Sequence, residues 1–320
     1  MIAGRGQAIP RAVIALALFT ALLPASPPPV ATMSVPEAPV LVGVREQETT
    51  DHEQAATEGG GAWLVEVASE ESVAPIPAKQ ITRRLDAYLA GRNVKVTAMV
   101  KDLATGRLYR YHPGERLITA STAKVQILMA LLLKTPWKKL PQAVRHDAEL
   151  MIRYSDNHAA DRLWLRVGGA AGFTKAGRRL GLKDTQGVAG QCVDLYCWGI
   201  TRTSVDDQIR LMRALVSGKS PLKAADREHV LDLMGRVIDG QNWGISAAAC
   251  AGDRVALKNG WLRRVSNKLW ATISVGLLRG DGRDYAVAVL TEGSPDVGYG
   301  IATVEGVVRR IMRDFRTCPE

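Results

Sequence analysis

The 320-residue sequence has few side chains that could bind a transition metal, with five histidines and four cysteines. Four of the histidines are scattered along the chain: His112, His146, His158 and His229. No histidine stands at the spacing from a cysteine that a zinc site requires. The sequence therefore predicts no metal site.

Aromatic residues are also scarce, at 5% of the chain. Residues 79–320 contain 39 Lys and Arg against 23 Asp and Glu, and a basic surface of this kind can bind nucleic acid. However, no basic motif is interleaved with aromatic residues, and no signature of a nucleic-acid-binding fold is present. We therefore expect no nucleic-acid partner. The positive charge indicates a solvated basic surface or attraction to an anionic cell envelope.

The apolar segment near the N-terminus is too short to cross a bilayer comfortably. Arg5 and Arg11 precede the apolar run Ala12–Leu23, and small residues suited to cleavage lie within 24–31. This pattern predicts a signal peptide over residues 1–31, with an uncleaved signal anchor as the alternative. The mature protein is then expected to be secreted or associated with the cell envelope, with no stable membrane span. Because residues 1–31 contain no cysteine, the sequence implies no lipid-anchored N-terminus.

Residues 32–78 differ in composition from the rest of the chain. They are acidic and rich in Pro, Ala and Glu, and they include the glycine run at 59–61. Such a composition predicts a disordered linker, although the apolar residues 62–67 could form a short strand. The remaining residues, 79–320, are numerous enough to bury one sizeable core and are interpreted as one domain.

Four cysteines in an exported chain predict two disulfides, for which three pairings are possible. Cys192 and Cys197 are close enough in sequence to close a small loop. That choice leaves Cys250 with Cys318, which would tie the C-terminus to the segment before Lys258. Free thiols are the alternative.

Hydrophobic periodicity predicts strands at both ends of the domain and helices between them. The expected strands are 94–100, 107–112, 254–261, 270–279 and 284–291. The expected helices are 81–90, 121–134, 141–153, 158–167, 173–180, 204–217, 224–237 and 299–315. This order predicts an α+β fold: a five-stranded antiparallel sheet, in which the last three strands join the first two, flanked by helices and carrying an all-helical subdomain.

Ser121 and Lys124 stand at the head of one of the most apolar stretches of the chain, residues 125–133. An apolar run of this kind suits a buried helix. Residues three apart in a helix share one face, so the hydroxyl and the amine lie close together. Because burial favours the neutral amine, Lys124 could take a proton from Ser121. The pattern predicts a serine nucleophile with a lysine base.

A second Ser-x-x-Lys pattern occurs at Ser220 and Lys223, but here a structural role explains the residues. Ser220 precedes Pro221 and a helical pattern that begins at Ala224. We expect Ser220 to cap that helix, with Pro221 in its first turn.

Two further motifs distinguish the first pattern from the second. Ser155-Asp156-Asn157 follows it, and Lys258-Asn259-Gly260 lies in a predicted strand near the C-terminus. In this order the three motifs resemble S-x-x-K, S-D-N and K-[ST]-G of the penicillin-recognising serine enzymes, and the Ala-Ala pair after S-D-N is typical of the class A β-lactamase-like group. The resemblance covers about residues 79–318 and implies the same α+β architecture.

The resemblance also implies a role for each motif residue. Ser121 would be the nucleophile, Lys124 its proton acceptor and Ser155 a proton shuttle to the leaving group. Asn157 would donate to a substrate carbonyl and to Lys124, while Lys258 would attract an anionic substrate group and assist Ser155. Asn259 and Gly260 belong to the substrate-binding strand. The backbone N–H of Trp261, paired with that of Ser121, would form the oxyanion hole.

Three departures from the family pattern affect the expected activity. The third motif carries Asn259 where the family has Thr or Ser, which puts carboxylate recognition in question. The stretch between Lys124 and Ser155 is short, so the cleft rim should be reduced. The family's loop glutamate, which activates the deacylating water, has no counterpart, since no glutamate occurs between Glu149 and Glu228. Asp194 is the one carboxylate of the corresponding loop and is a possible deacylation base.

These observations predict an exported serine hydrolase that acts through a Ser121 acyl-enzyme on a β-lactam or a peptide- or ester-like carbonyl, with slow deacylation. The alternatives are a cell-wall D,D-peptidase or esterase, and a weakly catalytic protein that binds peptidoglycan or β-lactams. The expected partner is a small-molecule or peptidoglycan-like substrate. No cofactor or metal is required, and the chain is expected to be a monomer.

Overall fold

The computed structural model describes residues 75–190, 197–280 and 283–318. The predicted signal peptide and nearly all of the predicted linker lie outside these residues, as do Asp194 and Cys192. Within them, no helix is long and apolar enough to cross a membrane.

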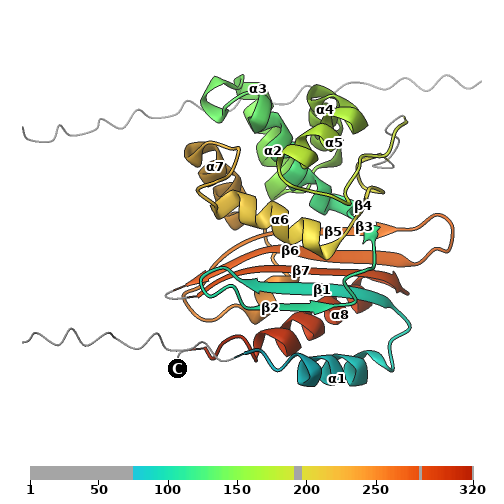
Figure 1. Cartoon of the computed structure of the whole chain (residues 1–320). Helices are drawn as coiled ribbons and strands as arrows, with labels where there is room; N and C mark the ends of the chain where they lie inside the picture. Colours follow the sequence, from blue (N-terminus) through green and yellow to red (C-terminus); the bar gives the residue numbers. More distant parts are fainter. Residues whose placement is uncertain (1–74, 191–196, 281–282, 319–320) are drawn as a thin grey trace, which may run out of the picture. The chain divides into compact units, whose positions relative to one another are not determined.

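The centre of the fold is a five-stranded sheet whose neighbouring strands all run antiparallel (Figure 1). Its spatial order is β2-β1-β7-β6-β5, so the last three strands of the chain join the first two, as the sequence predicts. The strands are β1 Lys95–Asp102, β2 Leu108–Tyr111, β5 Arg254–Arg263, β6 Trp270–Gly280 and β7 Arg283–Ser294. This order leaves β5, which carries the third motif, at an edge of the sheet.

Helices cover both faces of the sheet (Figure 1). The terminal helices α1 Ala78–Leu89 and α8 Val297–Met312 lie on one face. The other face carries α2 Ala123–Lys134, α3 Gln142–Arg153, α4 Asn157–Val167, α5 Gly169–Arg179, α6 Val205–Val216 and α7 Ala224–Gly235. The predicted α+β class is therefore confirmed.

Successive side chains of a strand point to opposite faces of the sheet, and the apolar core is therefore divided into two layers. On β7, Val287 and Val289 pack in the layer beneath α1 and α8. Their neighbours Ala286, Ala288 and Leu290 pack in the layer beneath the helical subdomain. The central strands are thus apolar on both faces, because both faces are covered.

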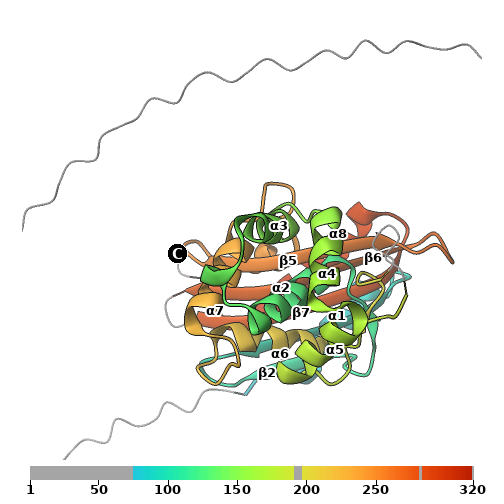
Figure 2. The same ribbon diagram turned by 90° about the horizontal axis from the view of Figure 1, so that it is seen from above.

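Helix α2 runs through the middle of the helical subdomain, in contact with α3, α4, α5 and α7 (Figure 2). Every residue from Ala123 to Leu132 is buried. This position explains why the sequence of α2 is apolar on all sides, and it means that Lys124 is carried into the interior.

A short two-stranded sheet, absent from the sequence predictions, lies beside the start of α2. It pairs β3 Leu117–Ile118 with β4 Arg202–Thr203. Its two strands are far apart in sequence and only two residues long, so local periodicity gives no signal for it. The pairing fixes the chain that leads into Ser121.

Most element boundaries lie within three residues of the predicted ones, and the start of α5 differs by four residues. Helix α5 begins at Gly169 rather than at residue 173, because Gly168 ends α4 in a left-handed conformation (φ 100°) and the next helix starts at once. The predicted helix cap at Ser220 is wrong: Lys223 is the N-cap of α7, with no side-chain cap bond. Ser220 instead accepts a hydrogen bond from the Leu222 N–H (3.3 Å) in the preceding turn, where Leu222 is buried.

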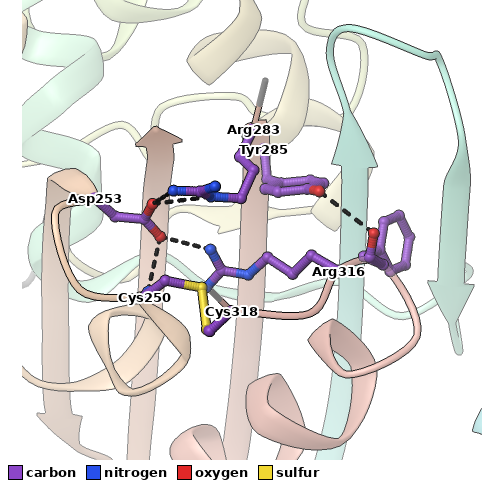
Figure 3. The surroundings of a disulfide bond; sticks show 7 residues. Cys250, Asp253, Arg283, Tyr285, Arg316 and Cys318 are labelled. Carbon is purple, nitrogen blue, oxygen red and sulfur yellow. Dashed lines mark hydrogen bonds and ion pairs between the residues drawn. A yellow bond between two sulfur atoms is a disulfide. The ribbon is translucent and has the colours of Figure 1, made fainter. Parts of the chain in front are cut away.

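The predicted disulfide between Cys250 and Cys318 is present and ties the C-terminus to the start of β5 (Figure 3). Beside it, the buried carboxylate of Asp253 accepts hydrogen bonds from Arg283 (3.3 Å) and Arg316 (2.5 Å). The tether and the ion pairs therefore secure the same end of the sheet. The other predicted disulfide, Cys192–Cys197, involves Cys192 and so lies outside the described residues.

Replacing both Cys250 and Cys318 with serine should lower the free energy of unfolding by roughly 2–4 kcal/mol, because the bond closes a long loop in the unfolded chain (sequence separation 68). Urea unfolding monitored by circular dichroism measures the change, with Thr317→Ala at the neighbouring exposed position as the control. An unchanged unfolding midpoint would show that the Asp253 ion pairs alone hold this end of the sheet.

Candidate functional site

Ser121 lies in the 3-10 turn η1 Ala120–Thr122, which leads directly into α2. Backbone bonds from Thr119 N to Thr201 O and from Ala120 N to Gly199 O, both 2.8 Å, hold the turn against a distant part of the chain. Ala120 adopts a left-handed φ of 43°, which is costly for alanine and is maintained by these bonds. Ser121 itself is 9% exposed, whereas Lys124 one turn later is fully buried.

The amine of Lys124 connects the first two motifs. Its Nζ lies 3.0 Å from Ser121 Oγ and 3.2 Å from Ser155 Oγ. It also donates to the carbonyl oxygen of Ser155 (2.6 Å) and to Asn157 Oδ1 (2.8 Å). The predicted donation from Asn157 to Lys124 is therefore wrong in direction, because the amide oxygen of Asn157 faces the amine and can only accept. All four partners are neutral groups.

This environment favours the neutral form of Lys124. Burial lowers its pKa well below the usual 10.5, and the nearby Lys258 lowers it further, outweighing Asp156 and Asp161. A neutral amine has two N–H bonds and one lone pair. The Ser155 carbonyl and Asn157 Oδ1 can only accept, so they take the two hydrogens. The lone pair is then left for a hydroxyl, that of Ser121 or Ser155.

Ser155 lies in the tight turn between α3 and α4, and Asn157 is the first residue of α4. Ser155 has a left-handed φ of 56°, and both its carbonyl and its hydroxyl contact Lys124. Asp156 caps α4 by accepting from the Ala159 N–H (2.6 Å). Ala159 is buried, so small side chains allow α4 to approach α2.

Lys258 reaches the same turn from the edge strand β5. Its Nζ lies 3.0 Å from Ser155 Oγ, 3.1 Å from Asn259 O and 3.4 Å from Gln241 Oε1. Burial lowers the pKa of Lys258 to about 7. The Ser155 hydroxyl therefore lies between two amines that are both easily deprotonated, an arrangement suited to passing a proton.

Gly260 allows β5 to pass very close to the nucleophile. A Cβ at this position would lie 2.7 Å from the backbone nitrogen of Ser121. The next residue, Trp261, is partly exposed, and its ring centroid lies 6.1 Å from that of Trp243. The absence of a side chain at Gly260 thus brings the backbone of the strand beside the Ser121 N–H.

Asn259 is 1% exposed and is bonded to the protein. Its Nδ2 donates to the carbonyls of Gln241 and Trp243, both at 2.9 Å. Any donation from this amide to a substrate would require one of those bonds to break.

Three residues of this site were not identified from the sequence. Gln241 donates from Nε2 to the Tyr154 carbonyl (2.8 Å) and so bridges the Ser155 turn and β5. The second residue is Trp198, whose buried ring has its centroid 4.6 Å from Lys124 Nζ. The third is Asp161, whose Oδ1 accepts a hydrogen bond from Trp198 Nε1 (2.8 Å). Only Asp161 had a usable signal, since it lies four residues after Asn157 on the same helix. Gln241 and Trp198 come from loops whose sequences do not indicate where they fold.

The structure thus brings seven of the sequence-predicted residues into one cluster around Lys124: Ser121, Ser155, Asn157, Lys258, Asn259, Gly260 and, through its backbone, Trp261. Asp194 lies outside the described residues, so its role stays a prediction. His158 is exposed.

Comparison with known proteins identifies one family. Residues 137–315 match the model of the beta-lactamase enzyme family. The putative lipoprotein LppW of Mycobacterium tuberculosis is 31% identical over 236 residues, which cover 71% of this chain and 72% of that protein.

Solved structures show the same fold at lower identity. A point mutant of PBP-A, solved as an acyl-enzyme complex with penicillin G, superimposes with a TM-score of 0.64 at 20% identity and covers 76% of this chain and 99% of that one. A class A beta-lactamase from Bacteroides cellulosilyticus gives 0.65 at 15% identity, with the same coverage. The family match spans more than half of the chain and the fold agrees with it, so this protein belongs to the beta-lactamase enzyme family.

Proposed function

We propose that the protein is a serine hydrolase that forms an acyl-enzyme on Ser121. The observation that carries this proposal is the 3.0 Å contact between Ser121 Oγ and Lys124 Nζ. The amine is fully buried, and its hydrogen-bond partners are all neutral groups. An amine of lowered pKa beside a serine hydroxyl is the arrangement that activates serine without a histidine.

Acylation would begin when Ser121 Oγ attacks the substrate carbonyl carbon and gives its proton to Lys124 Nζ. The tetrahedral oxyanion would accept hydrogen bonds from the backbone N–H groups of Ser121 and Trp261, which the missing side chain of Gly260 brings together.

The leaving group would take its proton from Ser155 Oγ. Lys124 (3.2 Å) and Lys258 (3.0 Å) both contact that hydroxyl, so either amine can resupply the proton. Asn157 would hold Lys124 through Oδ1 and offer its Nδ2 to a substrate carbonyl. When Lys124 is the donor, the proton released by Ser121 passes through Lys124 and Ser155 to the nitrogen or oxygen of the broken bond, and Lys124 returns to its neutral form.

Deacylation is proposed to be slow. The family glutamate has no counterpart in the sequence, and the indole of Trp198 covers Lys124 with an apolar surface. The described carboxylate on that side, Asp161, already accepts from Trp198 Nε1. Both features disfavour a water molecule activated by a base behind the acyl carbonyl.

We further propose that the protein acts outside the cytoplasm, at the cell envelope. Its relative LppW is described as a putative lipoprotein, and the Cys250–Cys318 disulfide suits an oxidising compartment. The substrate would be a β-lactam or a peptidoglycan-like peptide or ester, since the similar PBP-A mutant holds penicillin G as an acyl-enzyme.

Ser121→Ala should abolish covalent labelling by a fluorescent penicillin or a fluorophosphonate and leave the fold intact. Intact-mass spectrometry and circular dichroism measure the two effects. Ser220→Ala is the matched control, because it removes the serine of the second Ser-x-x-Lys pattern and should label like the wild type. Labelling that persists in Ser121→Ala would show that another residue is the nucleophile.

The wild-type acyl-enzyme should be long-lived. General-base assistance is worth roughly a hundred- to ten-thousand-fold in rate, so its absence should make turnover far slower than acylation. Mass spectra at increasing times after removal of free penicillin give the lifetime. If Asp194 supplies the base, Asp194→Asn should lengthen the lifetime further. Rapid hydrolysis by both proteins would reveal a base not considered above.

Lys258→Met should stabilise the protein at neutral pH while abolishing rapid acylation. The pKa of Lys258 is about 7 in the folded protein, against 10.5 in the unfolded chain. Between pH 7 and pH 10.5 the folded state therefore binds fewer protons at this residue than the unfolded state does. Its destabilising contribution therefore vanishes near pH 10.5, grows as the pH falls, and reaches roughly 5 kcal/mol below pH 7.

Thermal unfolding between pH 6 and 10 tests this expectation. The gain in stability of Lys258→Met over the wild type should shrink as the pH rises. Lys219→Met, at an exposed lysine, should show no such trend. A variant less stable than the wild type at every pH would mean that the hydrogen bonds of Lys258 outweigh the cost of burying it.

A further inference from the structure

The side chains that would be expected to recognise a substrate carboxylate are bonded to the protein itself. Both N–H groups of the Asn259 amide have carbonyl partners, Gln241 O and Trp243 O. The opposite orientation of the amide would place its oxygen against two carbonyl oxygens, so the hydrogen-bond network fixes this one. A threonine or serine here would have kept a hydroxyl able to donate elsewhere.

The amine of Lys258 is likewise hydrogen-bonded to the protein itself. It is fully buried, and its amine has three protein acceptors: Ser155 Oγ, Asn259 O and Gln241 Oε1. Even a charged ammonium has three hydrogens, and these are all accounted for.

Gln241 makes hydrogen bonds with both Lys258 and Asn259, the residues that would be expected to bind a substrate carboxylate. Its backbone carbonyl accepts from Asn259, its Oε1 contacts Lys258, and its Nε2 donates to the Tyr154 carbonyl just before Ser155. The residue is buried and comes from the loop between α7 and the 3-10 helix η3 Gly244–Ala248. One side chain thus holds the edge strand and the Ser155 turn together.

The charges around the amines also disfavour an anion. Burial lowers the pKa of both amines, that of Lys258 to about 7, so neither carries a full positive charge at neutral pH. The carboxylates of Asp156 and Asp161 are the negative groups that act on Lys124. The third motif therefore offers an incoming carboxylate no exposed cation, because Lys258 is fully buried.

We propose that this site is acylated by neutral carbonyl donors, uncharged esters or lactams, in preference to donors that carry a carboxylate, and that Gln241 is the positioning residue that sets this preference. The inference rests on the proposed Ser121 acyl-enzyme. The covalent step is unchanged: Ser121 Oγ bonds to the carbonyl carbon, the C–N or C–O bond breaks, and the leaving group takes a proton from Ser155.

The test compares benzylpenicillin with its methyl ester, which have the same lactam and differ in one charge. Acylation of Ser121 in the full-length protein is followed by intact-mass spectrometry, and each rate is divided by the rate of alkaline hydrolysis of the same compound. The methyl ester should react at least threefold faster. An equal or higher normalised rate for benzylpenicillin overturns the inference and leaves the acyl-enzyme standing, whereas no acylation by either compound overturns both.

Gln241→Ala tests the role of Gln241, with Asn242→Ala at the exposed neighbouring position as the control. Gln241→Ala removes the Oε1 acceptor of Lys258 and the Nε2 donor to Tyr154, whereas the backbone carbonyl that holds Asn259 remains. With Lys258 freed from this partner, the ratio of the ester rate to the acid rate should fall at least threefold, while the control keeps the wild-type ratio. A purely structural role would slow both compounds equally and leave the ratio unchanged, which would overturn the assignment of Gln241. If Gln241→Ala does not fold, the wild-type comparison still decides the preference itself.

Discussion

The burial of the Lys124 amine among neutral hydrogen-bond partners is the constraint on which the rest of the site depends. An amine in a low-dielectric interior is costly when charged, so the site favours the form that can accept a proton. The left-handed backbone of Ser155, the Asn157 amide and the Trp198 indole all serve to hold that amine in place. Without the surrounding helices, Lys124 would be an ordinary solvated lysine.

The fold must offset the cost of two buried lysines and two non-glycine residues with left-handed backbones in the same small region. It does so with a sheet that is covered on both faces and with ties between distant segments. The Cys250–Cys318 disulfide and the Asp253 ion pairs secure the end of the sheet where β5 begins. Selection for activity commonly leaves a site that destabilises its own protein. The buried Lys258 is such a case, because its replacement by Met is expected to raise stability.

Most elements could be predicted because their patterns are local. The strands alternate or are uniformly apolar, and α2 is apolar on all sides, so periodicity and length sufficed for both. The cap at Ser220 failed because the chain bends at Pro221 and Leu222, buries Leu222, and starts the helix only at Ala224, a tertiary effect that the Ser-Pro pattern cannot show. The start of α5 failed because a single glycine, Gly168, was enough to separate two helices.

The sequence by itself determined the chemical identity of the site: the three-residue spacing of Ser121 and Lys124, and the order of the three motifs. Only the tertiary structure decided what surrounds them. It turned Asn259 toward the carbonyls of Gln241 and Trp243, and it placed the Trp198 indole over Lys124. The reason is physical. A helix or strand fixes neighbours a few residues apart, whereas contacts between loops far apart in sequence depend on how the layers pack.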